Sequence, residues 1–171
     1  NDPYAQLGEA PAMRVTLPFP DGDRLPLAQV AAAQGGEELS PRITWEAVEG
    51  AGSYLVSCFD PDAPTMSGFW HWIVYDIPAS TTVLEAGAGS PGGSLPRGAK
   101  AGLNDAFVRS YIGAVPPYGH GEHRYFFTVT ALDTTSIDAP SELSGAFLHF
   151  MAREHVIARG HGHGVGRKPR G

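Results

Sequence analysis

Residues 54–77 read YLVSCFDPDAPTMSGFWHWIVYDI, and this stretch decides the fold class of the chain. The runs Tyr54–Phe59 and Trp70–Ile77 are dense in β-branched and aromatic residues, which predicts two strands. Pro61 and Pro64 lie between them. Because proline fixes φ and has no amide hydrogen, the first strand must end there in a rigid turn. Both faces of the second run are apolar, so we expect its strand at the centre of a sheet.

The rest of the chain continues the β pattern and adds one long loop. Met13–Leu17 and Arg42–Trp45 read as short strands, and Arg124–Leu132 reads as a strong one. Residues 85–102 are rich in glycine and proline and show no period, which predicts a loop. That loop is long for a compact domain, and loops of such length are often functional.

A single helix is expected near the C-terminus. Ser141 or Ser144 can cap its first turn, and Gly160 can end it. Apolar residues recur at spacings compatible with one helical face, namely Leu143, Phe147, Phe150 and Ile157. Many strands followed by one late helix favour a mainly β sandwich with a helix laid on it, rather than a parallel α/β sheet.

Composition limits the class of protein. The chain has 171 residues, the size of one domain, and its formal net charge of −6 argues against a nucleic-acid partner. A single cysteine, Cys58, excludes an internal disulfide and any CxxC metal or redox motif. No apolar run reaches the roughly 18 residues that a membrane span requires. No signal peptide is visible, so we expect a cytoplasmic protein, with a leader removed before Asn1 as the open alternative.

Charge is distributed unevenly along the chain. All acidic residues precede Gly160, whereas the basic residues Arg167, Lys168 and Arg170 follow it. Glycine-rich basic ends rarely fold. We therefore divide the chain into one domain over residues 1–160 and a flexible Gly/His/basic tail over residues 161–171.

Several familiar motifs fail in their context. Residues 87–92 fit the GxGxxG pattern, but they open no helix and no βαβ unit surrounds them, which argues against dinucleotide binding. His161 and His163 could hold a divalent ion, yet a solvated tail is the favoured interpretation. Walker A, HExxH and GxSxG strings do not occur. We therefore expect no cofactor and no metal.

Two aspartates mark a candidate pocket after the first strand. Asp60 and Asp62 lie two residues apart and, in an extended chain, point the same way. Either carboxylate could instead cap the turn by accepting backbone N–H bonds. We favour this capping role for Asp62, although it also remains a candidate for ligand binding. Asp60, at the end of the strand, is assigned to the pocket.

Histidines in two other strands complete the constellation. Period-two alternation places His71 on one face with Ile73 and Tyr75, opposite Trp70 and Trp72. A buried neutral histidine needs a partner for each ring nitrogen, and the nearby carboxylates are candidates. Farther along the chain, His123 and Tyr125 share one face of their strand. Arg124 points to the other face, where we expect it to form a structural ion pair.

These side chains together suit an anion better than a metal. They comprise one carboxylate, two imidazoles and one phenol, each able to donate a proton when suitably protonated. Small loop residues around Gly113 leave backbone N–H groups available to an oxyanion. The expected ligand is therefore a phosphate or carboxylate group.

Four strings occur in a specific order and spacing over roughly residues 10–160: DPDAP (60–64), GFWHW (68–72), YIGAVPP (111–117) and GEHRY (121–125). This arrangement resembles the phosphatidylethanolamine-binding protein family, in particular its bacterial, Raf-kinase-inhibitor-like branch. The resemblance implies two antiparallel sheets packed as a Greek-key-like sandwich, with a C-terminal helix and a small anion-binding pocket.

The resemblance also implies roles for individual residues. The family's pocket side chains correspond to Asp60, His71, His123 and Tyr125, and the main-chain part of its anion site corresponds to Gly113 and Val115. Family members commonly hold a second glycine where Val115 stands. Eukaryotic relatives inhibit kinases or proteases or act in transcriptional signalling, through surfaces that lie outside the shared strings.

Three functions are compatible with these residues. The first is a non-enzymatic module that binds a small anionic metabolite or a phospholipid headgroup. The second is an acid–base enzyme, an isomerase, cyclase or hydrolase, with His71 as base, Asp60 orienting it and Tyr125 as acid. Ser57 and Ser67 lie near the site in sequence but have no nucleophile motif. The third is an inhibitor-like module with a protein partner, and a homodimer is compatible with each.

Overall fold

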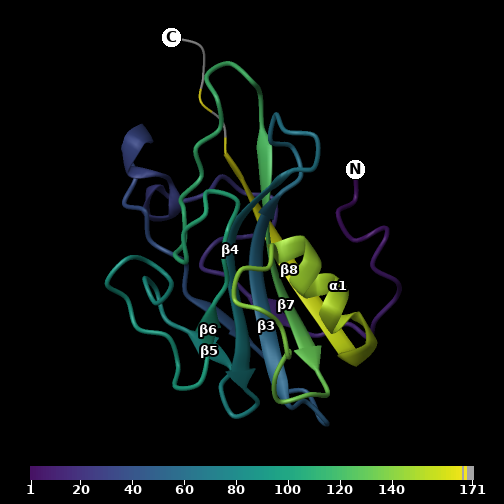
Figure 1. Ribbon diagram of the computed structural model, residues 1–171. Coiled ribbons are helices and arrows are strands. Elements are labelled where there is room, and N and C mark those ends of the chain that lie inside the picture. Colours follow the sequence, from purple (N-terminus) through teal and green to yellow (C-terminus); the bar gives the residue numbers. More distant parts are fainter. Residues whose placement is uncertain (167, 169–171) are drawn as a thin grey trace.

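Two antiparallel sheets and one short α-helix make up the computed structural model, which describes residues 1–166 and 168 (Figure 1). The larger sheet has the strand order β6-β4-β3-β7-β8, and the smaller has the order β1-β2-β5. The larger sheet consists of β3 (Ser53–Asp60), β4 (Phe69–Pro78), β6 (Lys100–Ala101), β7 (His123–Leu132) and β8 (Val156–Gly166). The smaller sheet consists of β1 (Val15–Thr16), β2 (Ile43–Trp45) and β5 (Val83–Leu84). Helix α1 spans Gly145–Ala152, and 3₁₀ turns cover Leu27–Gln29, Ala32–Gln34 and Arg153–His155.

The larger sheet is covered on both faces, which explains why its strands are apolar throughout. On one face it packs against the smaller sheet, in a core that includes Trp45 of β2 and Phe127 of β7. On the other face it packs against α1, where Leu148 of the helix belongs to the same cluster as Leu55 of β3. Strands buried on both faces read as continuous apolar runs rather than as alternating ones. The predicted fold class, mainly β with two antiparallel sheets and a helix near the C-terminus, is confirmed.

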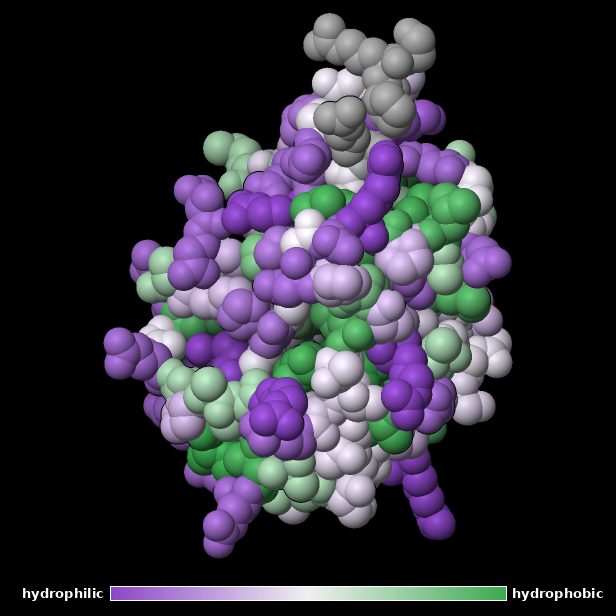
Figure 2. Space-filling view, turned by 180° about the vertical axis from the view of Figure 1, so that it is seen from behind, coloured by the Kyte–Doolittle hydropathy of each residue, from purple (hydrophilic) through white to green (hydrophobic). Residues whose placement is uncertain are grey.

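Hydrophilic and hydrophobic side chains are both present on the face of the molecule drawn in Figure 2. Figure 2 shows the side opposite to that of Figure 1, where hydrophilic side chains are interspersed with small hydrophobic areas. Within the described residues, the structure has no helix that is both long enough and apolar enough to span a bilayer.

The helix is shorter than predicted. Ser144 caps it, as expected, with its Oγ accepting a hydrogen bond from the Phe147 amide at 3.1 Å. It ends at Ala152, a 3₁₀ turn follows, and Ile157 lies in β8 rather than on a helical face. The predicted end at Gly160 is therefore wrong. The β-branched residues that follow the 3₁₀ turn favour a strand over a further helical turn.

Strand β8 also corrects the predicted domain boundary. Residues 161–166, expected to form a flexible tail, pair with β7 from Thr128 back to His123. Lys168 makes a bridge with Tyr118. Residues 167 and 169–171 of the predicted tail lie outside the described residues.

Alternating glycines explain how this strand packs. Gly160, Gly162 and Gly164 leave room on one face of β8 for the N-terminal segment, residues 13–25, to lie directly against the strand. A β-carbon at Gly160 would overlap the backbone carbonyl of Met13. Glycine in a strand interior is otherwise unfavourable, and it marks places where another backbone approaches closely. The glycine-rich composition that suggested flexibility therefore reflects close packing.

This packing predicts different costs for two neighbouring substitutions. Gly160→Ala should lower the free energy of unfolding by about 1–3 kcal/mol, because the backbone of Met13 cannot move aside without disturbing the N-terminal segment. Gly162→Ala meets only side chains, with the flexible end of Leu17 closest and Asp21 at ordinary contact distance, so its effect should be small and partly offset by the roughly 0.4–1 kcal/mol that alanine gains through the unfolded state. Urea denaturation of both variants measures the difference, and equal destabilisation would contradict this account of β8.

Candidate functional site

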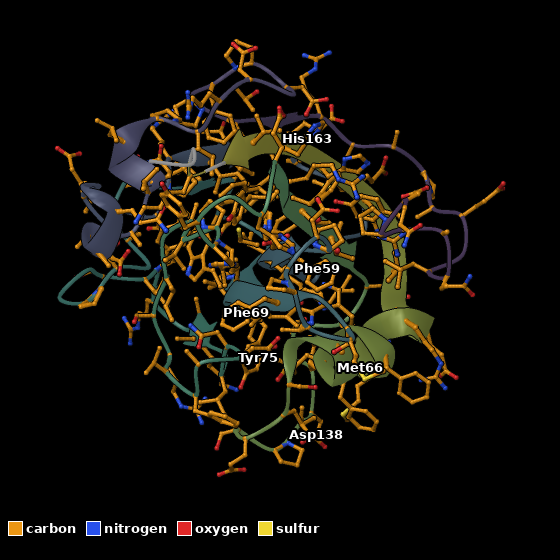
Figure 3. All side chains as sticks on the ribbon, turned by 90° about the horizontal axis from the view of Figure 1, so that it is seen from above. Phe59, Met66, Phe69, Tyr75, Asp138 and His163 are labelled. Atoms are coloured by element: carbon orange, nitrogen blue, oxygen red, sulfur yellow. The ribbon has the colours of Figure 1, made fainter. Side chains whose placement is uncertain are left out.

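A cavity lies where β3 ends and β7 begins, at the upper end of the larger sheet in Figure 1. Its volume is about 310 Å³. The structure brings together five of the predicted residues there: Asp60, His71, Val115, His123 and Tyr125. The remaining lining residues are Ala63, Pro64, Thr65, Phe69, Ala106, Ile112 and Pro117. Figure 3 looks down onto this end of the sheet and labels Phe59 on β3 and Phe69 on the neighbouring strand β4.

A β-bulge aims His71 into the cavity. Between Trp70 and Trp72 the strand β4 contains one residue more than the partner segment of β3, and that extra residue is His71. Bulges re-aim side chains in this way. Trp72 joins the core between the sheets, while Ile73 and Tyr75 pack on the helix side. The prediction that His71 shares a face with Ile73 and Tyr75 is therefore wrong, because simple alternation does not survive the bulge.

Asp60 and His123 form a buried hydrogen-bonded pair. Nδ1 of His123 lies 2.7 Å from Oδ2 of Asp60, and their side chains are 2% and 3% exposed. Since a carboxylate only accepts, this nitrogen carries the proton. The second oxygen of Asp60 accepts from the Asp62 amide at 2.7 Å. Both carboxylate oxygens therefore have donors before any ligand enters.

His120 extends this pair towards solvent and was not predicted. Its Nδ1 lies 2.7 Å from Nε2 of His123, and its side chain is exposed. One of the two nitrogens must donate, so Asp60, His123 and His120 form a continuous hydrogen-bonded chain. The sequence signal was a second histidine three residues before His123, in a glycine-flanked turn.

His71 is held in one tautomer by the backbone. Its Nδ1 lies 2.9 Å from the carbonyl oxygen of Ile112, so Nδ1 donates and Nε2 is left as the nitrogen available to a ligand. Burial lowers the pKa of His71, because the charged imidazolium is poorly solvated, although the Ile112 carbonyl and the charge of Asp60 act in the opposite direction. His71 is therefore neutral at pH 7.

Tyr125 supplies a hydroxyl group that stays protonated. Burial, and secondarily the charge of Asp60, raise the pKa of Tyr125 far above its ordinary value. Its ring meets that of His71 edge to face, with 5.3 Å between centroids. The phenol is therefore a permanent hydrogen-bond donor beside the neutral imidazole.

Asp62 does not line the cavity. Its carboxylate binds Arg124 in a two-point ion pair, with both nitrogen–oxygen distances at 2.8 Å, and it also accepts from the Arg124 amide. The hydrogen bonds from the Arg124 side chain hold the pKa of Asp62 below its usual value. The ion pair expected for Arg124 is thus formed with Asp62, and the ligand-binding role of Asp62 is not supported by this geometry.

The two predicted main-chain positions behave differently. The Gly113 amide donates to Glu38 at 3.0 Å, and Gly113 lies against the backbone of Ala31 rather than in the cavity. It is therefore not an available donor for an anion. Val115 does line the cavity, with 42% of its surface exposed. Its side chain makes that wall apolar.

Two further observations argue against a serine nucleophile and against a metal ion at this cavity. Ser57 lies on the helix side of the sheet, near His149, and so is no nucleophile for this cavity. Within the described residues, acidic, histidine and cysteine side chains form no group of three arranged to hold a metal ion. Apart from the Asp60–His123 pair and Thr65, whose hydroxyl donates to the Gly68 carbonyl, the cavity offers the Tyr125 hydroxyl, the neutral imidazole of His71 and apolar walls.

The chain is similar to known proteins along most of its length. A family profile described as phosphatidylethanolamine-binding protein matches residues 16–165. The Escherichia coli (strain K12) UPF0098 protein YbhB is 44% identical over 141 residues, which cover 81% of this chain and 89% of YbhB. The UPF0098 protein YbcL of the same organism is 42% identical over 155 residues, which cover 88% of this chain and 85% of YbcL.

A solved structure agrees with this assignment. The crystal structure of E. coli YbcL, described as a new member of the mammalian PEBP family, matches with a TM-score of 0.84 at 39% sequence identity, over 91% of this chain and 98% of that chain. The resemblance seen in the four sequence strings is thereby confirmed. From its profile match, its relatives and its fold, the chain belongs to the phosphatidylethanolamine-binding protein family.

Proposed function

We propose that the cavity binds the phosphate or carboxylate group of a small molecule. The observation that carries this proposal is the state of Asp60. Both of its oxygens already accept hydrogen bonds, from His123 and from the Asp62 amide. A carboxylate satisfied in this way does not need a cation, and donors from Tyr125 and a protonated His71 face the cavity instead.

His71 determines the proton balance of binding. In the free protein its Nε2 carries a lone pair, which repels an anion unless a proton is present between them. The proton comes either from the solvent, onto His71, or from the ligand as a monoprotonated phosphate. In both cases the complex contains one more shared proton, so binding strengthens as the pH falls.

The apolar part of the lining indicates what accompanies the anionic group. Phe69, Ile112 and Val115 surround the polar residues, so a ligand that carries a short apolar portion beside its anion fits better than inorganic phosphate. A phospholipid headgroup and a free phosphorylated metabolite share this chemistry. The name of the family supports the headgroup as one source.

A second candidate function, acid–base catalysis on a small metabolite, is favoured by one observation. The cavity holds an unprotonated imidazole nitrogen of His71 beside the protonated phenol of Tyr125, which is a base beside an acid. The orienting role expected of Asp60 for His71 is performed by the Ile112 carbonyl, since Asp60 is paired with His123. This function would be established if the protein converts a small metabolite and the variant His71→Asn does not.

The remaining sequence predictions concern location and assembly. A cytoplasmic location, an inhibitor-like protein partner and a homodimer all stay predictions. Fractionation of the native host tests the first. Size-exclusion chromatography with light scattering, and capture experiments with the full chain, test the other two.

The first prediction concerns pH. Dimethyl phosphate keeps a constant charge between pH 5 and 8, so any change in its affinity reports on the protein. Binding raises the lowered pKa of His71, so affinity should rise as the pH falls from 8 to 5, by at least about tenfold if one charge-assisted hydrogen bond forms. Calorimetric titration at several pH values measures this change.

The matched variant for that experiment is His71→Asn, whose amide can still donate to the Ile112 carbonyl but does not titrate. We expect this variant to lose the pH dependence. Affinity for dimethyl phosphate that stays constant from pH 5 to 8 in the unaltered protein would contradict the role of His71.

The second prediction concerns the phenol. Tyr125→Phe removes only the hydroxyl that faces the cavity, and affinity for dimethyl phosphate should fall about fivefold, the worth of one hydrogen bond. Tyr75→Phe is the control, since Tyr75 is equally buried but packs on the helix side of the same sheet. If both variants bind like the unaltered protein, the anion does not contact Tyr125.

A further inference from the structure

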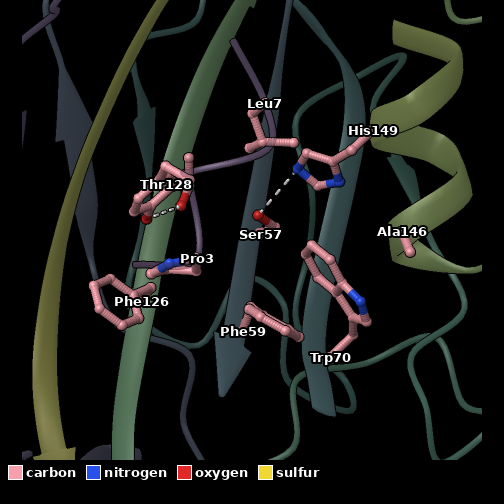
Figure 4. Close-up of a pocket in the computed structure, with 10 residues that line it drawn as sticks. Pro3, Leu7, Ser57, Phe59, Trp70, Phe126, Thr128, Ala146 and His149 are labelled. Carbon is pink, nitrogen blue, oxygen red and sulfur yellow. Dashed lines mark hydrogen bonds between the residues drawn. The ribbon is translucent and has the colours of Figure 1, made fainter. Parts of the chain in front are cut away.

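A second cavity lies on the opposite face of the larger sheet, beneath α1 (Figure 4). Its volume is about 160 Å³. Residues from β3, β4, β7, α1 and the N-terminal segment line it, namely Pro3, Tyr4, Leu7, Ser57, Phe59, Trp70, Phe126, Thr128, Ala146 and His149. The cavity lined by Asp60, His71 and His123 is on the other side of the sheet, so this is a separate site.

On one side of the cavity floor, Ser57 and His149 present a hydrogen-bond acceptor. Nδ1 of His149 lies 2.7 Å from the Gly145 carbonyl and must donate to it, which leaves Nε2 as an acceptor. Burial lowers the pKa of His149, so the ring is neutral. The Ser57 hydroxyl lies 3.4 Å from Nε2 and donates to it (Figure 4). With its proton used, the Ser57 oxygen can only accept from a ligand.

On the other side, Tyr4 and Thr128 present a donor. Their hydroxyl oxygens lie 2.7 Å apart, and one hydroxyl donates to the other. The proton of the accepting hydroxyl is left over for a ligand. Thr128 is the direct cross-strand neighbour of Ser57. Side chains in such pairs have β-carbons about 5 Å apart, so the acceptor and the donor stand side by side.

The walls above this floor are aromatic. Phe59 and Trp70 lie with their ring centroids 4.4 Å apart, and Trp70 also stacks on His149 at 4.9 Å. Phe126 closes the side nearest β7. An apolar cavity of about 150 Å³ is large enough to bind benzene. The volume here therefore suits one six-membered aromatic ring.

We propose that this cavity binds a small monocyclic phenol. Its hydroxyl donates to Ser57 and accepts from the Tyr4–Thr128 pair, and its ring packs among Phe59, Trp70 and Phe126. A single hydroxyl is the group that satisfies an acceptor and a donor lying side by side. This site is independent of the anion-binding function proposed above.

The experiment titrates the full chain with phenol and with toluene, which has the same size but no hydroxyl. Trp70 fluorescence, or the NMR signals of His149, reports occupancy. We expect saturable phenol binding in the millimolar range. Ser57→Ala should weaken phenol about fivefold and leave toluene unchanged or tighter, because only phenol loses a hydrogen bond.

Further variants test whether both ligands occupy this cavity and whether phenol uses the donor opposite Ser57. Ala146→Leu places a larger side chain at the rim of the cavity on α1 and should weaken both ligands, with little cost to the helix. The double variant Tyr4→Phe/Thr128→Val removes both hydroxyls opposite Ser57 and should repeat the selective loss of phenol, which covers the case in which Ser57→Ala folds poorly. His71→Asn, in the anion cavity, should leave both ligands unaffected.

The proposal is overturned if the unaltered protein shows no saturable phenol binding. It is also overturned if Ser57→Ala and the Tyr4→Phe/Thr128→Val double variant weaken phenol and toluene equally, since the ligand hydroxyl would then make no specific contact. Loss of phenol binding in His71→Asn would place the ligand in the other cavity and would likewise contradict the assignment.

Discussion

The buried pair of Asp60 and His123 is the contact on which the cavity at the end of β3 depends. It joins the last residue of β3 to the first residue of β7 across 63 positions of sequence, at 2.7 Å and almost without solvent. An unpaired carboxylate at that depth would be costly, and so would an imidazole with an unsatisfied N–H. Each group satisfies the other, and together they fix the edge of the cavity.

The bulge in β4 adds the second constraint. It turns His71 to the same side as Asp60 and His123, and the Ile112 carbonyl then fixes which nitrogen carries the proton. The result is a hydrogen-bond acceptor, the neutral imidazole of His71, next to a hydrogen-bond donor, the phenol of Tyr125. Burial therefore determines the protonation states of His71 and Tyr125, and the Ile112 carbonyl determines the tautomer of His71.

Much of this could be predicted from sequence, and the failures have identifiable causes. Apolar runs dense in β-branched and aromatic residues located β3, β4 and β7, and the DPDAP and GEHRY strings located Asp60 and His123. The face of the sheet on which His71 lies was predicted wrongly, because the alternation of residues in the sequence does not reveal a bulge. The Gly113 amide was wrongly expected to be available to an anion, because the side chain that binds it, Glu38, lies 75 residues away in the sequence. Long-range contacts of this kind are invisible to local pattern.

Strand β8 has a consequence for how copies of the chain meet. It is one border of the larger sheet, and its outward amides and carbonyls are engaged by the chain itself: Met13 binds Arg159, Gly22 binds His163 and Leu25 binds Val165, at 2.8–3.1 Å. The other border, β6, is only two residues long. A sheet whose borders are occupied or short offers no template for edge-to-edge growth. The glycines that admit the N-terminal segment thus also close this border to a second chain.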